Sequence, residues 1–315
     1  MLDTVIIGSG PAGLAAAIYA SRAALDYVVL EKAGYSGGQI VTTNDLDNYP
    51  GIPNIDGASF SMALQEHAEK LGATIKEATV TAIEKNDDMS FTIKIDEQDD
   101  ILTKTVILAT GANPRTLNIP GEAQFLSRGV YYCATCDGAF YRNKTTAVIG
   151  GGNTALEDVL FLAKICQKVY LIHRRDELRG DKKSQEKIFA LPNVEFIKSA
   201  VPKTIKGDKK VTSLEIEFKA TNTTKDIPVD GIFVAVGTIP NNQLVPDFVA
   251  KDEAGYVIAD ETGITNAPGF FVAGDLRTKG LRQVITAASD GANAVKSVTD
   301  YLNDGLYNEV QHLKK

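Results

Sequence analysis

The sequence predicts an α/β fold made of two similar halves, and three observations lead to this prediction. Each half opens with a short β-branched strand that ends in a glycine-rich turn, followed by a helix and a second apolar strand. Helical and strand patterns alternate along much of the chain, which is typical of sheets with helices on their faces. The chain has 315 residues, enough for two domains of ordinary size.

The first half begins with a predicted strand at residues 4–7. The turn at residues 8–13 reads Gly-Ser-Gly-Pro-Ala-Gly, a helix follows to Ala24, and residues 27–31 form the next strand. In this dinucleotide-binding pattern Gly8 permits the tight turn, Gly10 lets the main chain approach a pyrophosphate, and Gly13 allows close helix packing. Glu31 stands where a carboxylate accepts hydrogen bonds from a ribose diol. The alternative is a glycine turn that holds no ligand.

The rest of the first half contains one more helix and a group of short strands. Residues 59–71 place Phe60, Ala63, Leu64, Ala68 and Leu71 on one helical face. Residues 79–107 then alternate short strands with charged turns, which predicts a small β meander attached to the parallel sheet.

The second half repeats the pattern with one change of charge. A strand at residues 146–149 leads into the turn Gly150–Ala155, a helix runs to about Cys166, and residues 168–173 form the partner strand. That strand ends in His173-Arg174-Arg175, with Arg179 four residues beyond, where the first half has its acid. Guanidinium groups bind a 2′-phosphate that a carboxylate would repel, so the prediction is NADP rather than NAD. A solvated basic turn is the alternative.

The first half resumes near the end of the chain. Residues 269–275 form an apolar strand that runs into a glycine turn, and a helix follows from about Gln283 to Leu302. We therefore predict two Rossmann-like three-layer dinucleotide-binding domains, the second, with the predicted NADP site, inserted into the first. The predicted ranges are 1–112 and 245–315 for the first domain and 113–244 for the inserted domain. Prolines near both crossings, Asn113-Pro114 and Ile239-Pro240, fit extended linkers that act as a hinge.

A pair of cysteines precedes the second glycine turn. Cys133-Ala134-Thr135-Cys136-Asp137 has the spacing of a reversible dithiol. Structural zinc needs four ligands, usually in two paired clusters, and no second cluster is present. Asp137 could donate or accept a proton, or simply cap a helix. Cys166 falls on the apolar side of its helix and is expected to be a buried thiol.

The turn Gly274-Asp275 also has two interpretations. The aspartate could cap the next helix or hydrogen-bond the ribityl chain of a flavin. In the second case Arg282-Gln283 would lie near the flavin ring, where the start of the helix can stabilise negative charge on the reduced flavin.

Composition excludes several classes of protein. The formal net charge is −7, which argues against nucleic acid as a partner. Three cysteines are too few for a disulfide-stapled secreted scaffold. The N-terminus shows no secretory leader, and the apolar runs are shorter than a membrane helix. We expect a cytoplasmic, soluble protein that does not enter membranes.

These motifs together resemble the low-molecular-weight, bacterial-type thioredoxin reductases, and the resemblance runs almost end to end. The residues that carry it are Gly8–Gly13, Gly37-Gly38-Gln39, Asn48-Tyr49-Pro50-Gly51, Ala109-Thr110-Gly111, Cys133–Gly138, Gly150–Ala155, His173–Arg179, Gly274-Asp275 and Leu281-Arg282-Gln283-Val284.

The resemblance implies a flavoprotein oxidoreductase in which electrons pass from NADPH through FAD to the disulfide Cys133–Cys136 and then to thioredoxin. Cys136 would face the flavin, Cys133 would attack thioredoxin, and Asp137 would assist proton transfer. It also implies a homodimer and an NADPH domain that rotates. The implied FAD contacts are Gly8, Gly10, Pro11, Ala12, Gly13, Glu31, Gly38, Gln39, Asn48, Thr110, Gly111, Gly274, Asp275, Arg282, Gln283 and Val284. The implied NADPH contacts are Gly152, Asn153, Thr154, His173, Arg174, Arg175 and Arg179.

Three alternatives share these motifs. A dithiol oxidase would pass electrons from a small dithiol to oxygen, and a ferredoxin-dependent or other-partner disulfide reductase would use a different donor or substrate. The dithiol oxidase and the ferredoxin-dependent reductase can dispense with a working NADPH site, so the intact Gly152 and Arg174-Arg175 elements argue against these two. A redox-sensing NADP-binding regulator would need no flavin and would be colourless.

Overall fold

In the computed structural model, which describes residues 1–43 and 46–304, the chain divides into two compact units. The first unit combines Met1–Asn113 with the chain from Ile239 onward, and the second is Pro114–Thr238. The two crossings, β7 (Ala112–Pro114) and β16 (Thr238–Pro240), pair with each other as a two-stranded sheet. The predicted second boundary lay at residue 244, and residues 239–244 group with the first unit. Residues 305–315 of the predicted last segment lie outside the described residues.

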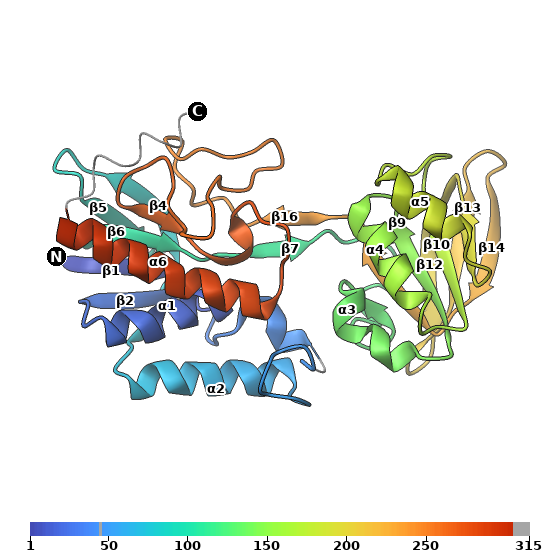
Figure 1. Ribbon diagram of the computed structural model, residues 1–315, viewed down its shortest axis with the longest axis horizontal. Coiled ribbons are helices and arrows are strands. Elements are labelled where there is room, and N and C mark those ends of the chain that lie inside the picture. Colours follow the sequence, from blue (N-terminus) through green and yellow to red (C-terminus); the bar gives the residue numbers. More distant parts are fainter. Residues whose placement is uncertain (44–45, 305–315) are drawn as a thin grey trace. The chain divides into compact units, whose positions relative to one another are not determined.

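The first unit is built on a seven-stranded sheet in which β6 joins two parts (Figure 1). The C-terminal part of β6 pairs in parallel with β1 and β17, and its N-terminal end pairs antiparallel with β5. The antiparallel meander of β4, β5 and β6 therefore continues the parallel sheet. The strands are β1 (Leu2–Ile7), β2 (Tyr27–Glu31), β3 (Ile75–Glu77), β4 (Val80–Lys85), β5 (Phe91–Ile95), β6 (Ile101–Leu108) and β17 (Phe270–Val272).

Helices cover one face of this sheet. The longest, α6 (Val284–Asp304), packs along α1 (Pro11–Arg22), and α1 also contacts α2 (Gly57–Lys70). Apolar residues of α1, α6 and the sheet form one buried cluster, while the opposite face packs on the segment from Val245 to Leu276. Two short 3₁₀ turns complete the unit, η1 (Gly38–Thr42) and η3 (Gly274–Leu276). No helix in the described ranges is long and apolar enough to cross a membrane.

The second unit has three layers. A parallel sheet in the order β11-β10-β9-β15-β8 lies between the helices α4 (Asn153–Leu162) and α5 (Lys182–Phe189) and a separate antiparallel sheet, β12-β13-β14. The strands are β8 (Val130–Tyr131), β9 (Thr145–Gly150), β10 (Lys168–Ile172), β11 (Val194–Ile197), β12 (Ala200–Gly207), β13 (Val211–Phe218), β14 (Thr223–Pro228) and β15 (Gly231–Ala235), and the short helical segments are α3 (Ala134–Asp137) and η2 (Gly138–Tyr141).

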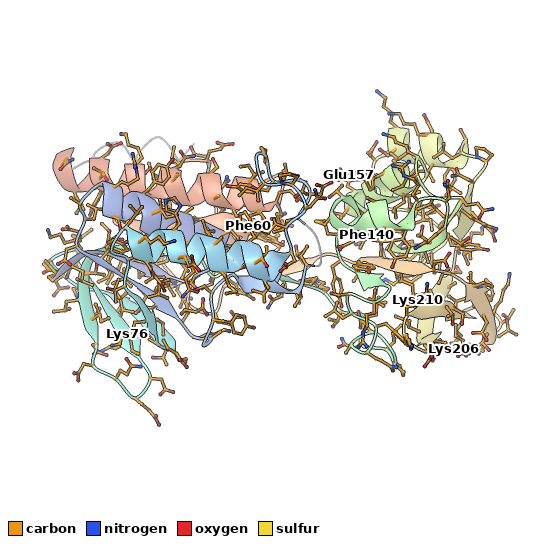
Figure 2. The ribbon with its side chains drawn as sticks, turned by 90° about the horizontal axis from the view of Figure 1, so that it is seen from below. Phe60, Lys76, Phe140, Glu157, Lys206 and Lys210 are labelled. Atoms are coloured by element: carbon orange, nitrogen blue, oxygen red, sulfur yellow. A yellow bond between two sulfur atoms is a disulfide. The ribbon has the colours of Figure 1, made fainter. Side chains whose placement is uncertain are left out.

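The α/β prediction is confirmed, with three differences of detail. The buried face of α2 is narrower than predicted, because Ala63 and Leu71 are exposed while Phe60 (labelled in Figure 2) and Ala68 are buried. Helix α4 ends at Leu162, before the predicted Cys166, and a turn follows. The antiparallel sheet of the second unit was not predicted.

Candidate functional site

The first glycine turn leaves open space at its centre. A Cβ added to Gly13 would collide with the carbonyl oxygen of Gly8, so strand and helix touch there, whereas a Cβ on Gly10 would meet no protein atom within 4 Å. Gly10 is also the N-cap of α1, and it supplies no side-chain cap. The first N–H groups of a helix need partners and attract anions. This turn therefore has the room and the donors to receive a phosphate.

Three segments distant in the sequence surround the first turn. The carboxylate of Glu31 accepts hydrogen bonds from Ser9 N and Ser9 Oγ, both at 2.8 Å. A Cβ on Gly38 would lie 3.7 Å from the Cα of Gly10, and a Cβ on Gly274 would lie 2.9 Å from the Cβ of Ala12. The predicted residues of strand β2, of η1 and of the Gly274 turn thus lie at the start of α1.

Asp275 has a carboxylate oxygen that accepts no hydrogen bond from the described protein atoms, although Lys279 Nζ lies 3.7 Å from it. Its Oδ1 is buried and has no hydrogen-bond partner among them. Burial raises the pKa of this carboxyl, while the nearby charges of Lys279 and Arg282 lower it. A buried acceptor of this kind calls for a donor, since an unpaired one costs free energy. A ligand hydroxyl, such as one of a flavin's ribityl chain, fits this position.

Other predicted residues of the first unit are joined in smaller groups. Asn48 Nδ2 donates to Gln283 Oε1 at 3.0 Å, and Gln39 Nε2 donates to the carbonyl of Ala112. The guanidinium of Arg282 stacks 4.2 Å from the ring centroid of Tyr256, and its Nε is buried without a hydrogen-bond partner among the described atoms. Thr110 Oγ1 donates to the Asn241 carbonyl at 2.7 Å and Gly111 O accepts from Asn241 N at 2.9 Å. The arrangement fits FAD, because one unit contains all the features that this cofactor needs. These are a glycine turn with room for a phosphate, a carboxylate placed to bind a ribose, and buried polar atoms without hydrogen-bond partners among the described atoms.

The second glycine turn has the same open centre. Gly152 is the N-cap of α4 without a side-chain cap, and a Cβ there would meet no atom within 4 Å. The loop after β10 closes onto this turn, since Arg179 N donates to Gly151 O at 2.6 Å. Asn153 uses its Oδ1 to accept from Asp181 N at 2.8 Å, so this predicted contact residue also anchors the loop. Asn153 and Thr154 are both exposed.

Three cationic side chains stand around this turn. Arg174, Arg175 and Arg179 are exposed, and no ion pair among the described residues includes them. His173 is only 5% exposed, and burial, followed by the charges of the three arginines, lowers its pKa, so it is neutral at pH 7. Its Nε2 is buried without a partner in the described part of the chain. The loop therefore presents three exposed guanidinium groups that make no ion pair within the described residues, which suits a nucleotide phosphate.

The two cysteines of the predicted dithiol form a disulfide. Cys133 is the N-cap of α3, and its Sγ accepts a hydrogen bond from Cys136 N at 3.2 Å. Helix α3 contacts α4, and a Cβ on Gly138 would lie 2.8 Å from the ring of Phe161 on α4. The packing of these helices places the disulfide in the same unit as the arginine-bearing turn. Within the described residues, no group of three or more His, Cys, Asp or Glu side chains is arranged to hold a metal ion.

The surroundings of the disulfide combine a buried acid with exposed apolar surface. Asp137 is 6% exposed, and burial, with a contribution from its charge, raises the pKa of both Tyr131 and Tyr141. Phe140, in the same segment, is 46% exposed and is labelled in Figure 2. Cys166 is a buried free thiol, and burial raises its pKa.

Sequence reasoning missed several buried charges. Arg277, Lys279 and Asp290 form a hydrogen-bonded cluster beside Asp275 in the first unit. Asp158 is 8% exposed on α4, where burial and then the charge of Glu157 raise its pKa to about 7. Both aspartates interrupt apolar helical patterns, and that interruption was the available signal.

Comparison with known proteins agrees with this geometry. Residues 2–291 match the family described as "Pyridine nucleotide-disulphide oxidoreductase". The chain is 39% identical over 303 residues to a thioredoxin reductase of Listeria innocua, covering 96% of this chain and 94% of the relative. It is 41% identical over 309 residues to that of Peptoclostridium acidaminophilum, covering 95% and 96%.

A solved structure shows the same relationship. The crystal structure of thioredoxin reductase from Streptococcus pyogenes superposes with a TM-score of 0.90 at 41% identity, covering 96% of this chain and 99% of that one. These similarities confirm the predicted resemblance, the oxidoreductase class and FAD and NADPH as cofactors. The chain belongs to the pyridine nucleotide-disulphide oxidoreductase family.

Proposed function

We propose that this chain catalyses the NADPH-dependent reduction of a thioredoxin disulfide, with FAD held by the first unit and NADPH by the second. The observation that carries the proposal is a disulfide, Cys133–Cys136, within the same unit as the arginine-bearing glycine turn. When bound, the two nucleotides supply an electron pair from NADPH and deliver it by way of FAD. The remaining chemistry belongs to the side chains of this protein and of its substrate.

That electron pair would reduce the disulfide of the two cysteines, and the resulting thiols would reduce the substrate by thiol–disulfide exchange. Two electrons and two protons reduce the Cys133–Cys136 bond to two thiols. The Cys133 thiolate then attacks one sulfur of the substrate disulfide, which releases the other as a thiolate and forms a mixed disulfide. Attack by the Cys136 thiolate on Cys133 restores the internal disulfide and frees the substrate as a dithiol. Cys136 is the expected electron acceptor and Cys133 the sulfur that meets the substrate.

Asp137 would donate and accept the protons that the two cysteines exchange in these steps. It directly follows Cys136 and is almost fully buried. The raised pKa values of Tyr131 and Tyr141 keep both phenols neutral at physiological pH, so among these groups the carboxyl of Asp137 is the one suited to exchange a proton.

The nucleotide positions follow from charge. The contacts proposed for the 2′-phosphate of NADPH are Arg174, Arg175 and Arg179, whose guanidinium groups are exposed beside the Gly152 turn. Glu31, which lies beside the Gly10 turn, would hold the ribose of FAD.

Assembly, mobility and location form part of the proposal. We propose a cytoplasmic homodimer, supported by exposed apolar side chains of the first unit, among them Leu281 at 58% and Ile258 at 48%. We also propose that the crossings β7 and β16, each three residues long, act as the hinge for rotation of the NADPH unit. Analytical ultracentrifugation tests the dimer: a single sedimenting species of monomer mass would contradict it.

The experiment that tests the activity follows NADPH oxidation with oxidised thioredoxin from the same cell. The wild type should turn over. Cys136→Ser should lose thioredoxin-dependent turnover while keeping its yellow flavin, because the disulfide can no longer form. Cys166→Ser is the matched control, since that thiol is buried and not bonded to another cysteine.

The outcomes separate the alternatives. Turnover with reduced ferredoxin but not with NADPH would indicate a ferredoxin-dependent reductase, and dithiol-dependent oxygen consumption without NADPH would indicate a dithiol oxidase. A colourless purified protein would indicate the regulator. Absence of thioredoxin-dependent turnover in the wild type contradicts the proposal.

A further inference from the structure

A buried ionic cluster lies beneath the Gly274-Asp275 turn. The carboxylate of Asp290 on α6 binds the guanidinium of Arg277 at both oxygens, with Nη2 to Oδ1 at 2.7 Å and Nε to Oδ2 at 3.0 Å. Its Oδ2 also accepts from Lys279 Nζ at 2.8 Å and from Gly274 N at 3.0 Å. The side chains of Arg277, Lys279 and Asp290 are 6%, 5% and 3% exposed. One carboxylate of α6 thus holds one backbone N–H and two cationic side chains of the segment 274–279.

Burying such an ionic cluster contributes little net free energy to the stability of a fold. Removing charges from water costs several kcal/mol per ion, and well-packed apolar residues of similar volume often serve stability equally well. Loss of one partner, in contrast, leaves an uncompensated buried charge. A carboxylate in the interior of α6 therefore points to a role in positioning what it holds.

The cluster holds the turn against the predicted FAD site. A Cβ on Gly274 would lie 2.9 Å from the Cβ of Ala12, and a Cβ on Gly291, the residue after Asp290, would meet the Ala12 carbonyl. Ala12 is in the first turn of α1. Asp290 therefore lies where α6, the Gly274 turn and the start of α1 meet. Its hydrogen bond to Gly274 N fixes the position of the turn relative to the start of α1.

The same cluster controls the charge around Asp275. Lys279 Nζ is 3.7 Å from Asp275 Oδ1, too far for a hydrogen bond but close enough for attraction. Asp275 Oδ1 itself has no hydrogen-bond partner among the described atoms. Because Lys279 is hydrogen-bonded to Asp290, it does not close onto Asp275, and this acceptor stays available.

We propose that Asp290 is a positioning residue for FAD: it anchors Gly274 and restrains Arg277 and Lys279 so that Asp275 keeps an open acceptor for a hydroxyl group of the flavin's ribityl chain. The inference rests on the proposed function, in which FAD occupies the first unit. Asp290 does not contact the cofactor in this scheme and acts only through the turn.

The test measures FAD release from the purified, full-length flavoprotein. Holoprotein is diluted in steps, and free FAD is followed by its fluorescence, which gives a dissociation constant without any turnover assay. Asp290→Asn keeps the volume and an acceptor for Gly274 N but removes the charge that restrains the two cations. Loss of an outer-shell partner typically costs roughly 10- to 100-fold in affinity at metal sites, and we expect a rise of about tenfold here.

A second variant addresses Lys279 alone. Lys279→Met keeps a long apolar stem and leaves the Asp290–Arg277 pair intact. The charged groups that act on Asp275 are Lys279 and Arg282, which lower its pKa, and Asp290, which raises it. Without Lys279 that pKa rises, so FAD affinity should fall as the pH is lowered from 8 to 6. The wild type should show a smaller difference.

Val298→Ala is the matched control, because Val298 is a fully buried residue of the same helix that does not take part in the cluster. It should lower the melting temperature of the apoprotein and leave the FAD dissociation constant unchanged. Unchanged FAD affinity in Asp290→Asn overturns the inference and leaves the proposed function standing. If that variant does not fold, unchanged affinity and pH response in Lys279→Met overturn it. A wild type that binds no FAD overturns the proposed function and this inference together.

Discussion

The two glycine turns of the molecule share one backbone design and differ in charge. Both helices begin at an uncapped glycine with open space before it, at Gly10 and at Gly152. Helices α2 and α5, in contrast, begin at Asp56 and Asp181, whose side chains cap them. In each unit, the backbone therefore has the room and the free donors that a phosphate site needs. In the proposed function, the side chains at the end of the second strand, an acid in one unit and a basic cluster in the other, would select the nucleotide.

The largest expected effect comes from filling the open space. Gly10→Val and Gly152→Val should each remove one nucleotide and leave the other. Overpacking costs about 1 to 3 kcal/mol, so affinity should fall by up to roughly 150-fold. FAD content, read from the visible spectrum, should drop only in the first variant, and NADPH binding, measured by calorimetry, only in the second. Loss of both nucleotides in either variant would show that the two turns are not independent.

The arginines should account for the difference between the nucleotides. Arg174→Ala with Arg175→Ala should raise the KM for NADPH about 30-fold, because a hydrogen bond to a charged group contributes about 1.5 to 3 kcal/mol. The KM for NADH, which has no 2′-phosphate, should change little. Steady-state kinetics with both nucleotides checks this. Equal effects on the two would mean that the arginines do not recognise the 2′-phosphate.

Glu31 should have a smaller effect on the other nucleotide. Glu31→Gln keeps the shape of the side chain but weakens its hydrogen bonds to a ribose, by about 1 kcal/mol, so FAD should dissociate about fivefold more readily. Fluorescence of released FAD measures it, with NADPH affinity as the internal control. A change in NADPH affinity of the same size would contradict the assignment of Glu31 to the first nucleotide.

The smallest effect concerns the stability of the second unit. Asp158 occupies the position in α4 that Ala16, fully buried, occupies in α1. Its pKa rises from an ordinary 3.8 to about 7 because of burial, so between these values the folded protein keeps a proton that the unfolded chain releases. Stability contributed by this protonated carboxyl is present below pH 4 and is lost as the pH rises to about 7.

Asp158→Asn should therefore stabilise the protein at pH 8, by about 1 kcal/mol, and flatten the decline in stability between pH 5 and pH 7. Calorimetric melting across that range checks both expectations. Glu157→Gln, on the exposed side of the same helix, is the control and should leave most of the decline in place. A wild-type melting temperature that does not fall between pH 5 and pH 7 would argue against a protonated Asp158.

Much of the fold was predictable because its signals are local. Strand β2 was predicted at the residues where it lies, since an apolar run bounded by turns specifies both ends. The sheet β12-β13-β14 was missed because its edge strand β14, which is exposed except at Ile227, shows little alternation and depends on pairing with β13. Asp158 and Asp290 each interrupt an apolar helical pattern, but this signal alone does not predict their burial, because partners or neighbours elsewhere in the fold decide whether a helical aspartate faces solvent.

The bare starts of α1 and α4 have a consequence for the life of the protein in the cell. Donors that no side chain satisfies bind water in the empty protein, and a bound nucleotide takes the place of that water. A ligand at 100 times its dissociation constant adds about 2.7 kcal/mol to the stability of the form that binds it. Chains that fail to acquire flavin would unfold more often and meet proteases sooner. Incomplete helix ends can thus couple survival of the polypeptide to the supply of its cofactor.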